Sequence, residues 1–180
     1  MALILSGDTG PSIVQSAALP TGSILQVIQT SKTDLFSTTS TSWVDWSGMS
    51  VTITPQFSNS KFLITLNSGC SNTSDNAFQY VKLQRNGADI ALGDSSGNAT
   101  RCWVDAAIGS TGTSAGFYFT VQKPLAGSFL DSPNTASVIT YKLQVIRTNA
   151  GTAFFGRSSN ADDGNRSAIP SVLTVQEIKG

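Results

Sequence analysis

The segment 138–147 is the longest uninterrupted strand pattern in the chain, and it constrains the fold more than any other stretch. Tyr141, Leu143 and Val145 share one face, and Lys142 and Gln144 lie on the other. Ten residues is near the upper limit for a strand, and the turn sequence DSPN at 131–134 separates this strand from an apolar run before it. We therefore expect a central strand of an antiparallel β-sandwich.

Short alternating segments fill the rest of the chain after residue 22, and no helical pattern of useful length interrupts them. Asn86-Gly87 is the strongest hairpin signal, and 67–76 is expected to be a polar loop. Strands at this spacing, bounded by Gly, Pro and Ser turns, indicate a sandwich or barrel. We expect an all-β antiparallel sandwich of jelly-roll type over residues 23–180. The expected strands cover 24–28, 43–46, 49–53, 62–66, 77–85, 88–92, 103–108, 117–121, 138–147, 152–156 and 172–178.

Residues 1–22 stand apart from this domain as a short extended arm. Leu3, Ile4 and Leu5 form an apolar run, followed by a cluster of turn-forming residues. An arm of this kind can add a strand to the sheet of another protein, so these three residues are the candidate anchor. The alternative is an edge strand of the same domain.

The composition excludes several classes of function. Lys plus Arg and Asp plus Glu both number 11, and this zero net charge argues against a nucleic-acid partner, which would require a basic face. The absence of His removes Ser-His-Asp and Cys-His nucleophile systems and the commonest metal ligand. We expect no enzyme activity, no cofactor, no membrane insertion and no secretory signal, hence a soluble protein made in a cytosol. Cys70 and Cys102 are expected to be structural free thiols, buried in the fold.

One acidic loop has the look of a calcium site, but its spacing is wrong. Asp162 and Asp163 precede Gly164-Asn165, yet no acidic residue follows at the twelfth position of an EF-hand loop. A solvated turn is the favoured interpretation. The Asn-x-Ser/Thr triplets at Asn72, Asn98 and Asn165 are expected to be chance matches in a protein without a secretory signal.

Aromatic residues lie on both faces of several strands, which favours a homo-oligomer. Trp43 and Trp46 are three apart, Tyr118 opposes its neighbours Phe117 and Phe119, and Phe154 adjoins Phe155. A sandwich of one chain buries a single face of each strand, so the second face would need a partner. The residues expected at a subunit interface are Trp46, Tyr118, Tyr141 and Phe155.

The order of four motifs resembles a module found in virion structural proteins of tailed phages. The motifs occupy residues 22–64, 79–94 (with the Asn-Gly hairpin), 129–148 (with DSP before a strand) and 171–178. The module resembles the jelly roll of complement globular heads and tumour-necrosis-factor-like domains, which form trimers. The opening MALILSGDTG also resembles tail-fibre-like proteins. The resemblance implies a homotrimer on the virion surface, assembled in the host cytoplasm and bound to other phage structural proteins.

The short arm excludes a long fibre, because about a dozen residues between Asp8 and Pro20 span at most roughly 40 Å. We therefore expect a trimeric knob held close to the particle, as a capsid decoration or cement protein or a short tail-fibre appendage. The alternative is a knob that binds a host receptor or glycan through its outer loops, 67–76, 94–100, 109–116 and 157–168. The candidate receptor-facing residues in those loops are Asn72, Asp75, Asn98, Asp162, Asp163 and Asn165.

Overall fold

The computed structural model describes residues 16–74, 77–108, 122–158 and 167–180. Within these residues a 3-10 helix at Ser16–Ala18 is followed only by strands and connecting segments. The strands are β1 (Ile24–Lys32), β2 (Phe36–Thr38), β3 (Val44–Ile53), β4 (Lys61–Asn72), β5 (Ala77–Arg85), β6 (Ala88–Ile90), β7 (Val104–Ile108), β8 (Lys123–Asp131), β9 (Ile139–Thr148), β10 (Ala153–Phe155) and β11 (Ser171–Ile178).

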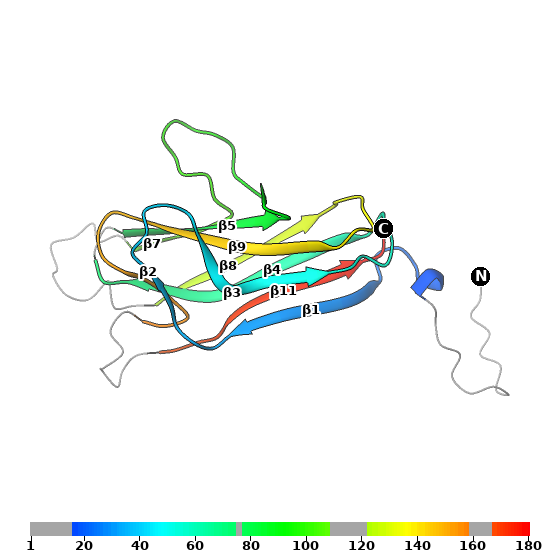
Figure 1. Ribbon diagram of the computed structural model, residues 1–180, viewed down its shortest axis with the longest axis horizontal. Helices are drawn as coiled ribbons and strands as arrows, with labels where there is room; N and C mark the ends of the chain where they lie inside the picture. The colour runs from blue at the N-terminus through cyan, green and yellow to red at the C-terminus, as the bar shows by residue number, and fades with distance from the viewer. Residues whose placement is uncertain (1–15, 75–76, 109–121, 159–166) are drawn as a thin grey trace.

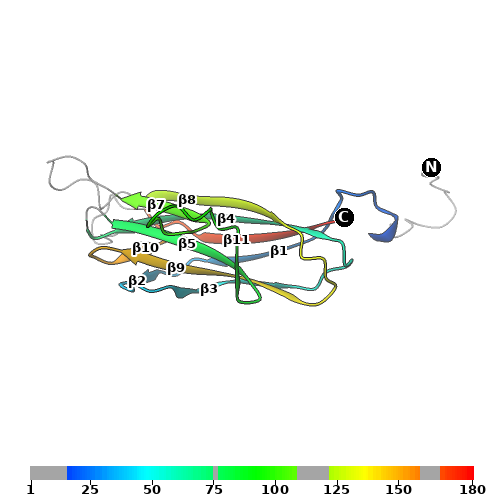
Figure 2. The same ribbon diagram turned by 90° about the horizontal axis from the view of Figure 1, so that it is seen from above.

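Two antiparallel sheets pack face to face in an elongated sandwich (Figures 1 and 2). In the first sheet, β4 pairs with β8 along one edge and with β11 and then β10 along the other, while β1 and β2 lie outermost. In the second sheet, β9 lies between β3 and β5, and β6 and β7 both pair with β5. This arrangement confirms the predicted all-β antiparallel sandwich.

The predicted central strand and the predicted hairpin are both present. In β9, Tyr141, Leu143 and Val145 are fully buried, and the residues between them are partly exposed. Asn86 and Gly87 adopt positive φ values of 49° and 84° and connect β5 to β6. Positive φ at both central residues is the type I′ geometry that suits the twist of a two-residue hairpin.

The core lies between the sheets and follows the alternation of each strand. Phe62, Ile64 and Leu66 of β4 face Leu143 and Val81 of the second sheet's strands within one buried cluster. At one end, Trp46, Phe36 and Phe155 form an aromatic group, with the Trp46 and Phe155 ring centroids 4.6 Å apart. Such ring pairs stabilise a core beyond the apolar area they bury.

The predicted interface residues Trp46, Tyr141 and Phe155 are instead part of this core. They are 1%, 0% and 1% exposed, so the prediction that they contact a second subunit is wrong. The β3–β9 register shifts between Asp45 and Ser50, where Gly48 has a φ of 83°, and this bulge turns both Trp46 and Met49 inward.

Phe154 next to Phe155 also finds its cover within the same chain. Its ring is 9% exposed and lies 4.7 Å from the guanidinium carbon of Arg157. The Arg157 guanidinium thus covers the ring face of Phe154, so this ring needs no second subunit to cover it. Tyr118, the fourth predicted interface residue, lies outside the described residues.

The predicted polar loop at 67–76 is wrong over most of its length, because β4 continues to Asn72. The small polar residues at this end are buried and make side-chain hydrogen bonds inside the fold. The Ser68 and Ser171 hydroxyls lie 2.6 Å apart, and the Ser71 hydroxyl donates to the Arg157 carbonyl. Partners so distant in sequence override a local preference for a loop.

A buried carboxylate joins the two sheets at the opposite end of the core. Asp131, which ends β8, accepts hydrogen bonds at both oxygens from Arg85 Nη1, at 2.7 and 2.8 Å. The Tyr141 hydroxyl donates to the same carboxylate at 2.8 Å. Burial and this hydrogen bond raise the pKa of Tyr141 well above its usual value. The cluster therefore connects β8 of the first sheet to β5 and β9 of the second.

The described part of the predicted arm is fixed to the sandwich near the C-terminus. The Lys179 ammonium donates to the carbonyl oxygens of Ala17 and Leu19, at 2.8 and 2.5 Å. Backbone hydrogen bonds join Gly22 and Ser23 to Lys179. Residues 16–22 are thus held at the end of the sandwich where Figure 1 marks the C-terminus, and the 3-10 helix projects beyond the strands there. The candidate anchor Leu3, Ile4 and Leu5 lies outside the described residues.

Both cysteines are free thiols, as expected. Cys70 is fully buried in β4, and burial raises its pKa to about 12. Cys102 is only partly buried, so the expectation of a buried thiol is wrong at this position. It lies in the segment 91–103, which projects from the sandwich after β6 (Figure 1).

Candidate functional site

The outer face of the first sheet carries no charged side chain across the centre of its four long strands. Side chains alternate along each strand, so the core residues point inward and the residues between them point outward. We call this surface the uncharged face. Its residues are Val27, Gln29 and Ser31 of β1; Val172, Thr174, Gln176 and Ile178 of β11; Leu63, Thr65 and Asn67 of β4; and Pro124, Ala126, Ser128 and Leu130 of β8.

Apolar side chains concentrate in one row across the uncharged face. Strand register places Val27 opposite Gln176, Gln176 opposite Leu63, and Leu63 opposite Leu130. Val27 and Leu130, at the two margins, are 54% and 49% exposed. Beside this row, a shallow hollow of about 380 Å³ is lined by residues of β4 and β8, among them Thr65, Asn67, Ala126 and Ser128. The face is therefore apolar in part, with a hollow beside the apolar row.

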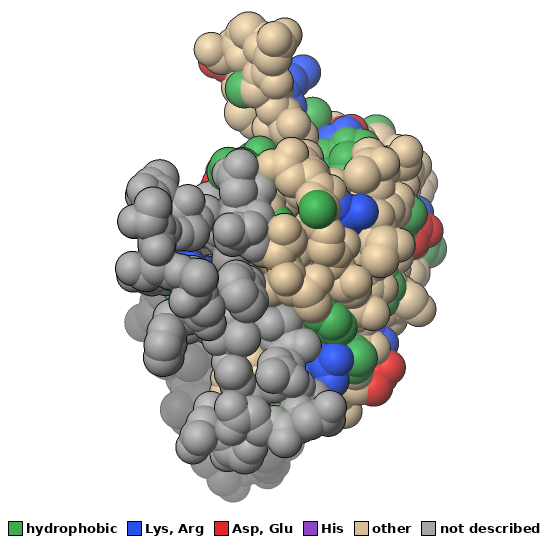
Figure 3. All heavy atoms as spheres, turned by 90° about the vertical axis from the view of Figure 1, so that its left-hand side faces the viewer, with side chains coloured by type: hydrophobic (Ala, Val, Ile, Leu, Met, Phe, Trp, Pro, Cys, Tyr) green, Lys and Arg blue, Asp and Glu red, His purple; other side chains and the backbone are tan. Residues whose placement is uncertain are grey.

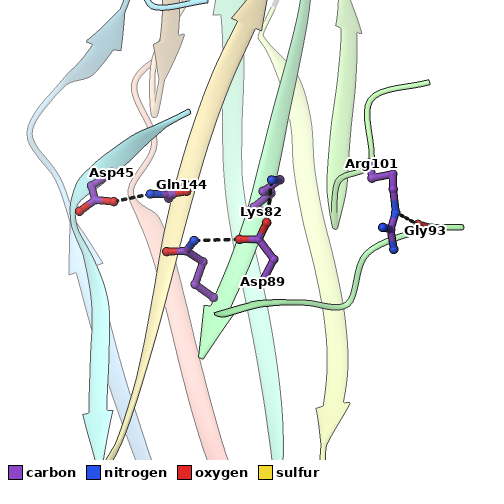
Figure 4. A network of polar contacts seen from close by, with 7 residues as sticks. Asp45, Lys82, Asp89, Gly93, Arg101 and Gln144 are labelled. Atoms are coloured by element: carbon purple, nitrogen blue, oxygen red, sulfur yellow. Dashed lines mark hydrogen bonds and ion pairs between the residues drawn. The ribbon is translucent and has the colours of Figure 1, made fainter. Parts of the chain in front are cut away.

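The outer face of the second sheet is different, because two ion pairs cross it. Asp45 of β3 contacts Lys142 of β9 at 2.9 Å, and Asp89 of β6 contacts Lys82 of β5 at 2.7 Å. Gln144 donates to Asp45, and Gln84 donates to Asp89, both at 2.8 Å. These residues lie on β3, β9, β5 and β6, which are neighbours in that order, and Figure 4 shows Asp45, Gln144, Lys82 and Asp89 in a row. We call the surface formed by these six residues the charged face.

The hydrogen bonds of the charged face hold both carboxylates in their ionised form. The Gln144 hydrogen bond and then that of Lys142 lower the pKa of Asp45. The Lys82 hydrogen bond, with a smaller contribution from Gln84, lowers the pKa of Asp89. Each lysine faces a carboxylate, so the four charges cancel and the patch carries no net charge at neutral pH.

An aromatic strip adjoins the charged face. Phe78 and Tyr80 alternate with buried Gln79 and Val81, so both rings point outward from β5. The two rings are nearly parallel, with a 3° angle between their planes and 6.2 Å between their centroids. The Lys82 ammonium lies 4.5 Å from the centroid of the Trp43 ring. All three aromatic side chains are only partly buried.

Tyr80 connects this strip to the projecting segment 91–103. Burial, and then the nearby Cys102 and Asp105, raise the pKa of the Tyr80 hydroxyl. Asp105 lies opposite Tyr80 in the β5–β7 register. Within the segment, the Arg101 guanidinium donates to the Gly93 carbonyl at 2.6 Å (Figure 4). The tyrosine therefore stays protonated at neutral pH and can donate a hydrogen bond.

The structure does not bring the predicted receptor-facing residues together. Asn72 is fully buried, and its carbonyl oxygen accepts from the Ser74 amide, so the prediction that it faces a receptor is wrong. Asn98 is exposed on the projecting segment. The remaining candidates, Asp75, Asp162, Asp163 and Asn165, lie outside the described residues. Figure 3 shows one end of the sandwich, where few charged side chains interrupt the uncharged polar surface that is described.

The aromatic strip was not predicted as a site from the sequence. Trp46 was the tryptophan expected at an interface, whereas the structure buries Trp46 and leaves Trp43 outside the core. For Phe78 and Tyr80 the alternation in 77–85 was a usable signal, because Val81 and Leu83 fix the inward set. Gln79 weakened this signal, because a polar glutamine between two aromatic residues suggests that the rings point inward and the glutamine outward, whereas Gln79 is buried.

Two further features of the described residues concern metal binding and membrane spans. No group of three or more His, Cys, Asp or Glu side chains in this part of the chain could hold a metal ion. None of the helices described is both long and apolar enough to cross a membrane.

The sequence was also compared with protein-family models and with curated proteins, and neither comparison found a match.

Proposed function

We propose that this chain is a structural protein of a tailed-phage particle. In this proposal its sandwich is a jelly roll, three copies associate, and the N-terminal arm attaches the trimer to the virion surface. It serves as a capsid decoration or cement protein, or as a short tail-fibre appendage. Its partners are two further copies of itself and other phage structural proteins. The uncharged outer face of the first sheet is the observation that carries the proposal.

The strand order supports the jelly-roll assignment. The longer strands pair in a nested order, as the two arms of one long hairpin would. These eight strands are β1, β3, β4, β5, β7, β8, β9 and β11. The outermost pair of this order is β1 with β11, followed by β3 with β9, β4 with β8, and β5 with β7. Pairs β11–β4 and β9–β5 then complete two four-stranded sheets. A double Greek key would give this nesting, so the pairing supports the proposed jelly roll.

The uncharged face supports self-association. Among the described residues, two ion pairs lie on the outer face of the second sheet and none lies on the uncharged face. The two outer surfaces therefore differ in chemistry, although the chain has equal numbers of acidic and basic residues. Burying uncharged side chains such as Val27 and Leu130 costs no ion desolvation and removes apolar area from water. Interfaces are correspondingly depleted in charged residues at their centres.

A ring of three uses this face in a specific way. Contacts in a cyclic trimer are heterologous, so each subunit presents two different surfaces to its neighbours. In the proposed ring the uncharged face is turned toward the three-fold axis. The β1 margin of one copy then meets the β8 margin of the next copy, so that Ile24 and Val27 lie near Leu130 of the neighbour. The exposed apolar residues at both margins suit this contact.

The position of the arm supports attachment at one end of the sandwich. Lys179 fixes residues 17–19 near the C-terminus, so the arm leaves from there. The turn at 149–152 lies at the far end of the long axis in Figure 1 and would point away from the particle.

A density map of the whole particle tests the proposal. We expect trimeric density of this sandwich on the outside of the capsid or the tail, with the C-terminal end toward the particle. Particles that lack this chain altogether would overturn the assignment. A trimer attached through its turn at 149–152 would contradict the role of the arm.

A second candidate function, a knob that binds a host receptor or glycan, is favoured by one observation. The aromatic strip of Trp43, Phe78 and Tyr80 lies beside hydrogen-bonding groups on the charged face. This surface is on the opposite side of the sandwich from the uncharged face, so one protein can carry both functions.

A further inference from the structure

We infer that the charged face and the aromatic strip together form a binding site for a neutral saccharide. This inference takes up the second candidate function and moves its site from the loops to the outer surface of the second sheet. It does not depend on the trimer, because none of its residues belongs to the uncharged face.

The first observation is the arrangement of the strip and the polar row. Phe78 and Tyr80 follow each other along one face of β5, and Lys82 comes next on the same face. Lys82 lies opposite Gln144 in the β5–β9 register, and Gln144 lies opposite Asp45 in the β9–β3 register. The surface thus changes from aromatic to hydrogen-bonding within one strand repeat, about 7 Å.

This combination matches the chemistry of a pyranose. One side of a sugar ring presents C–H groups, which pack on the electron-rich face of an aromatic ring, and its rim presents hydroxyl groups. Each hydroxyl both donates and accepts, so it needs fixed acceptors and donors beside the ring. Asp45 and Asp89 supply ionised acceptors, and Lys82, Lys142 and the two glutamine amides supply donors.

The second observation is that these groups are held in place before any ligand binds. Each carboxylate accepts from one lysine and one glutamine, all within 2.7–2.9 Å. The Lys82 ammonium contacts both Asp89 and the Trp43 ring, so it fixes the ring relative to the acid. Groups that are already ordered lose little conformational entropy on binding, which favours affinity for a weakly interacting ligand.

The charge balance selects a neutral ligand. A nucleic acid or another polyanion needs unpaired cations, and both lysines here are paired with aspartates. A metal cation needs carboxylates whose charge is not already compensated, and both of these aspartates contact an ammonium. A hydroxyl-rich neutral ligand takes hydrogen bonds from this patch without breaking either ion pair.

Affinity electrophoresis tests the inference with defined probes. The full-length protein is run in native gels that contain dissolved dextran, mannan or galactan, and its mobility is compared with that in a gel without polymer. The variants are Trp43→Ala, Tyr80→Ala and Asp45→Asn, and the control is Ser58→Ala, an exposed position in the turn between β3 and β4 that belongs to neither face. Far-ultraviolet circular dichroism and a melting curve confirm that each variant is folded.

We expect at least one of these neutral polymers to retard the wild-type protein and the Ser58→Ala control equally. Loss of either aromatic ring should weaken retention by about three- to tenfold, and loss of the Asp45 charge by roughly tenfold or more. Asp45 is 55% exposed, so Asp45→Asn tests the site even where an aromatic variant fails to fold.

Either of two results would overturn the inference: unchanged mobility of the wild type with all three polymers, or equal retention of the wild type and Asp45→Asn. The mass of the protein in solution is measured separately. A retarded monomer would leave this inference standing while contradicting the proposed trimer.

Discussion

The clearest test of how this fold is held together is the removal of the Asp131 carboxylate. Asp131 is 6% exposed and connects β8 to Arg85 and Tyr141 of the second sheet. Replacing it with Ala leaves the Tyr141 hydroxyl, whose residue is fully buried, without an acceptor. A buried hydroxyl without a partner costs about 1–3 kcal/mol.

The loss of the Arg85 ion pair adds less. The Arg85 side chain is 31% exposed, so water can solvate the freed guanidinium, and the contribution is about 1 kcal/mol. We therefore expect Asp131→Ala to lower the free energy of unfolding by about 3 kcal/mol in total, which corresponds to a fall in Tm of roughly 6–12 °C for a chain of this size.

The assay is urea denaturation of four proteins at one fixed protein concentration: the wild type, Asp131→Ala, Tyr141→Phe and the double variant. Tyr141→Phe alone should cost about 1 kcal/mol, because Asp131 keeps its contact with Arg85. The double variant should cost about 1–2 kcal/mol less than the two single losses together, since no hydroxyl remains unpaired. Strict additivity, or a loss under 0.5 kcal/mol in Asp131→Ala, would refute the cluster as a connection between the sheets.

Three further predictions concern the core thiol, the hairpin and the arm. Because the pKa of Cys70 is raised to about 12 from 9.0, the folded state keeps the proton that the unfolded chain loses, and stability should fall by about 1 kcal/mol from pH 9 to pH 10. In Cys70→Ala, urea denaturation at the two pH values should show no such fall from this thiol. Gly87→Ala should cost about 1 kcal/mol in thermal melting, since φ at this residue is 84°, and an unchanged Tm would argue against the type I′ turn. Deleting residues 1–15 should leave the Tm unchanged yet prevent binding to particles that lack the native copy, and normal binding of the truncated protein would contradict the role of the arm. Lys179→Ala should lower the Tm, because residues 17–19 lose their hydrogen bonds to the Lys179 ammonium.

The fold could be predicted wherever local pattern and final environment agree. The alternation in 138–147 and the Asn86-Gly87 turn each contain enough information in a few neighbouring residues. The extension of β4 to Asn72 could not be predicted, because Ser68 and Ser71 are satisfied by partners about 100 and 86 residues away in sequence. A polar, Ser-rich segment has the same local appearance in a loop and in a strand with such partners.

The candidate site was predictable only in part, and for a related reason. Spacing alone placed Trp43 and Trp46 on opposite faces, but the bulge at Gly48 and the ring of Phe155 decided that Trp46 joins the core. Tyr141 has an apolar ring that suits a core and a hydroxyl that suits an interface. Its place in the core could not be predicted, because it depends on Asp131, which accepts the hydroxyl's hydrogen bond inside the fold. The uncharged face could not be identified from sequence, because it assembles residues of β1, β4, β8 and β11 whose register long-range pairing decides.

The central claim is that the uncharged face holds three copies of this chain together, and the molar mass in solution tests it most directly. Light scattering coupled to size exclusion, at micromolar concentration, should give three times the chain mass of 18.8 kDa for the wild type. Leu130→Lys, which places a charge on the β8 margin of the uncharged face, should shift the protein to monomer. Thr52→Lys, which adds the same charge to the exposed outer side of β3, should remain a trimer. A wild-type mass of 18.8 kDa, or a Leu130→Lys variant that keeps the wild-type mass, would contradict the account.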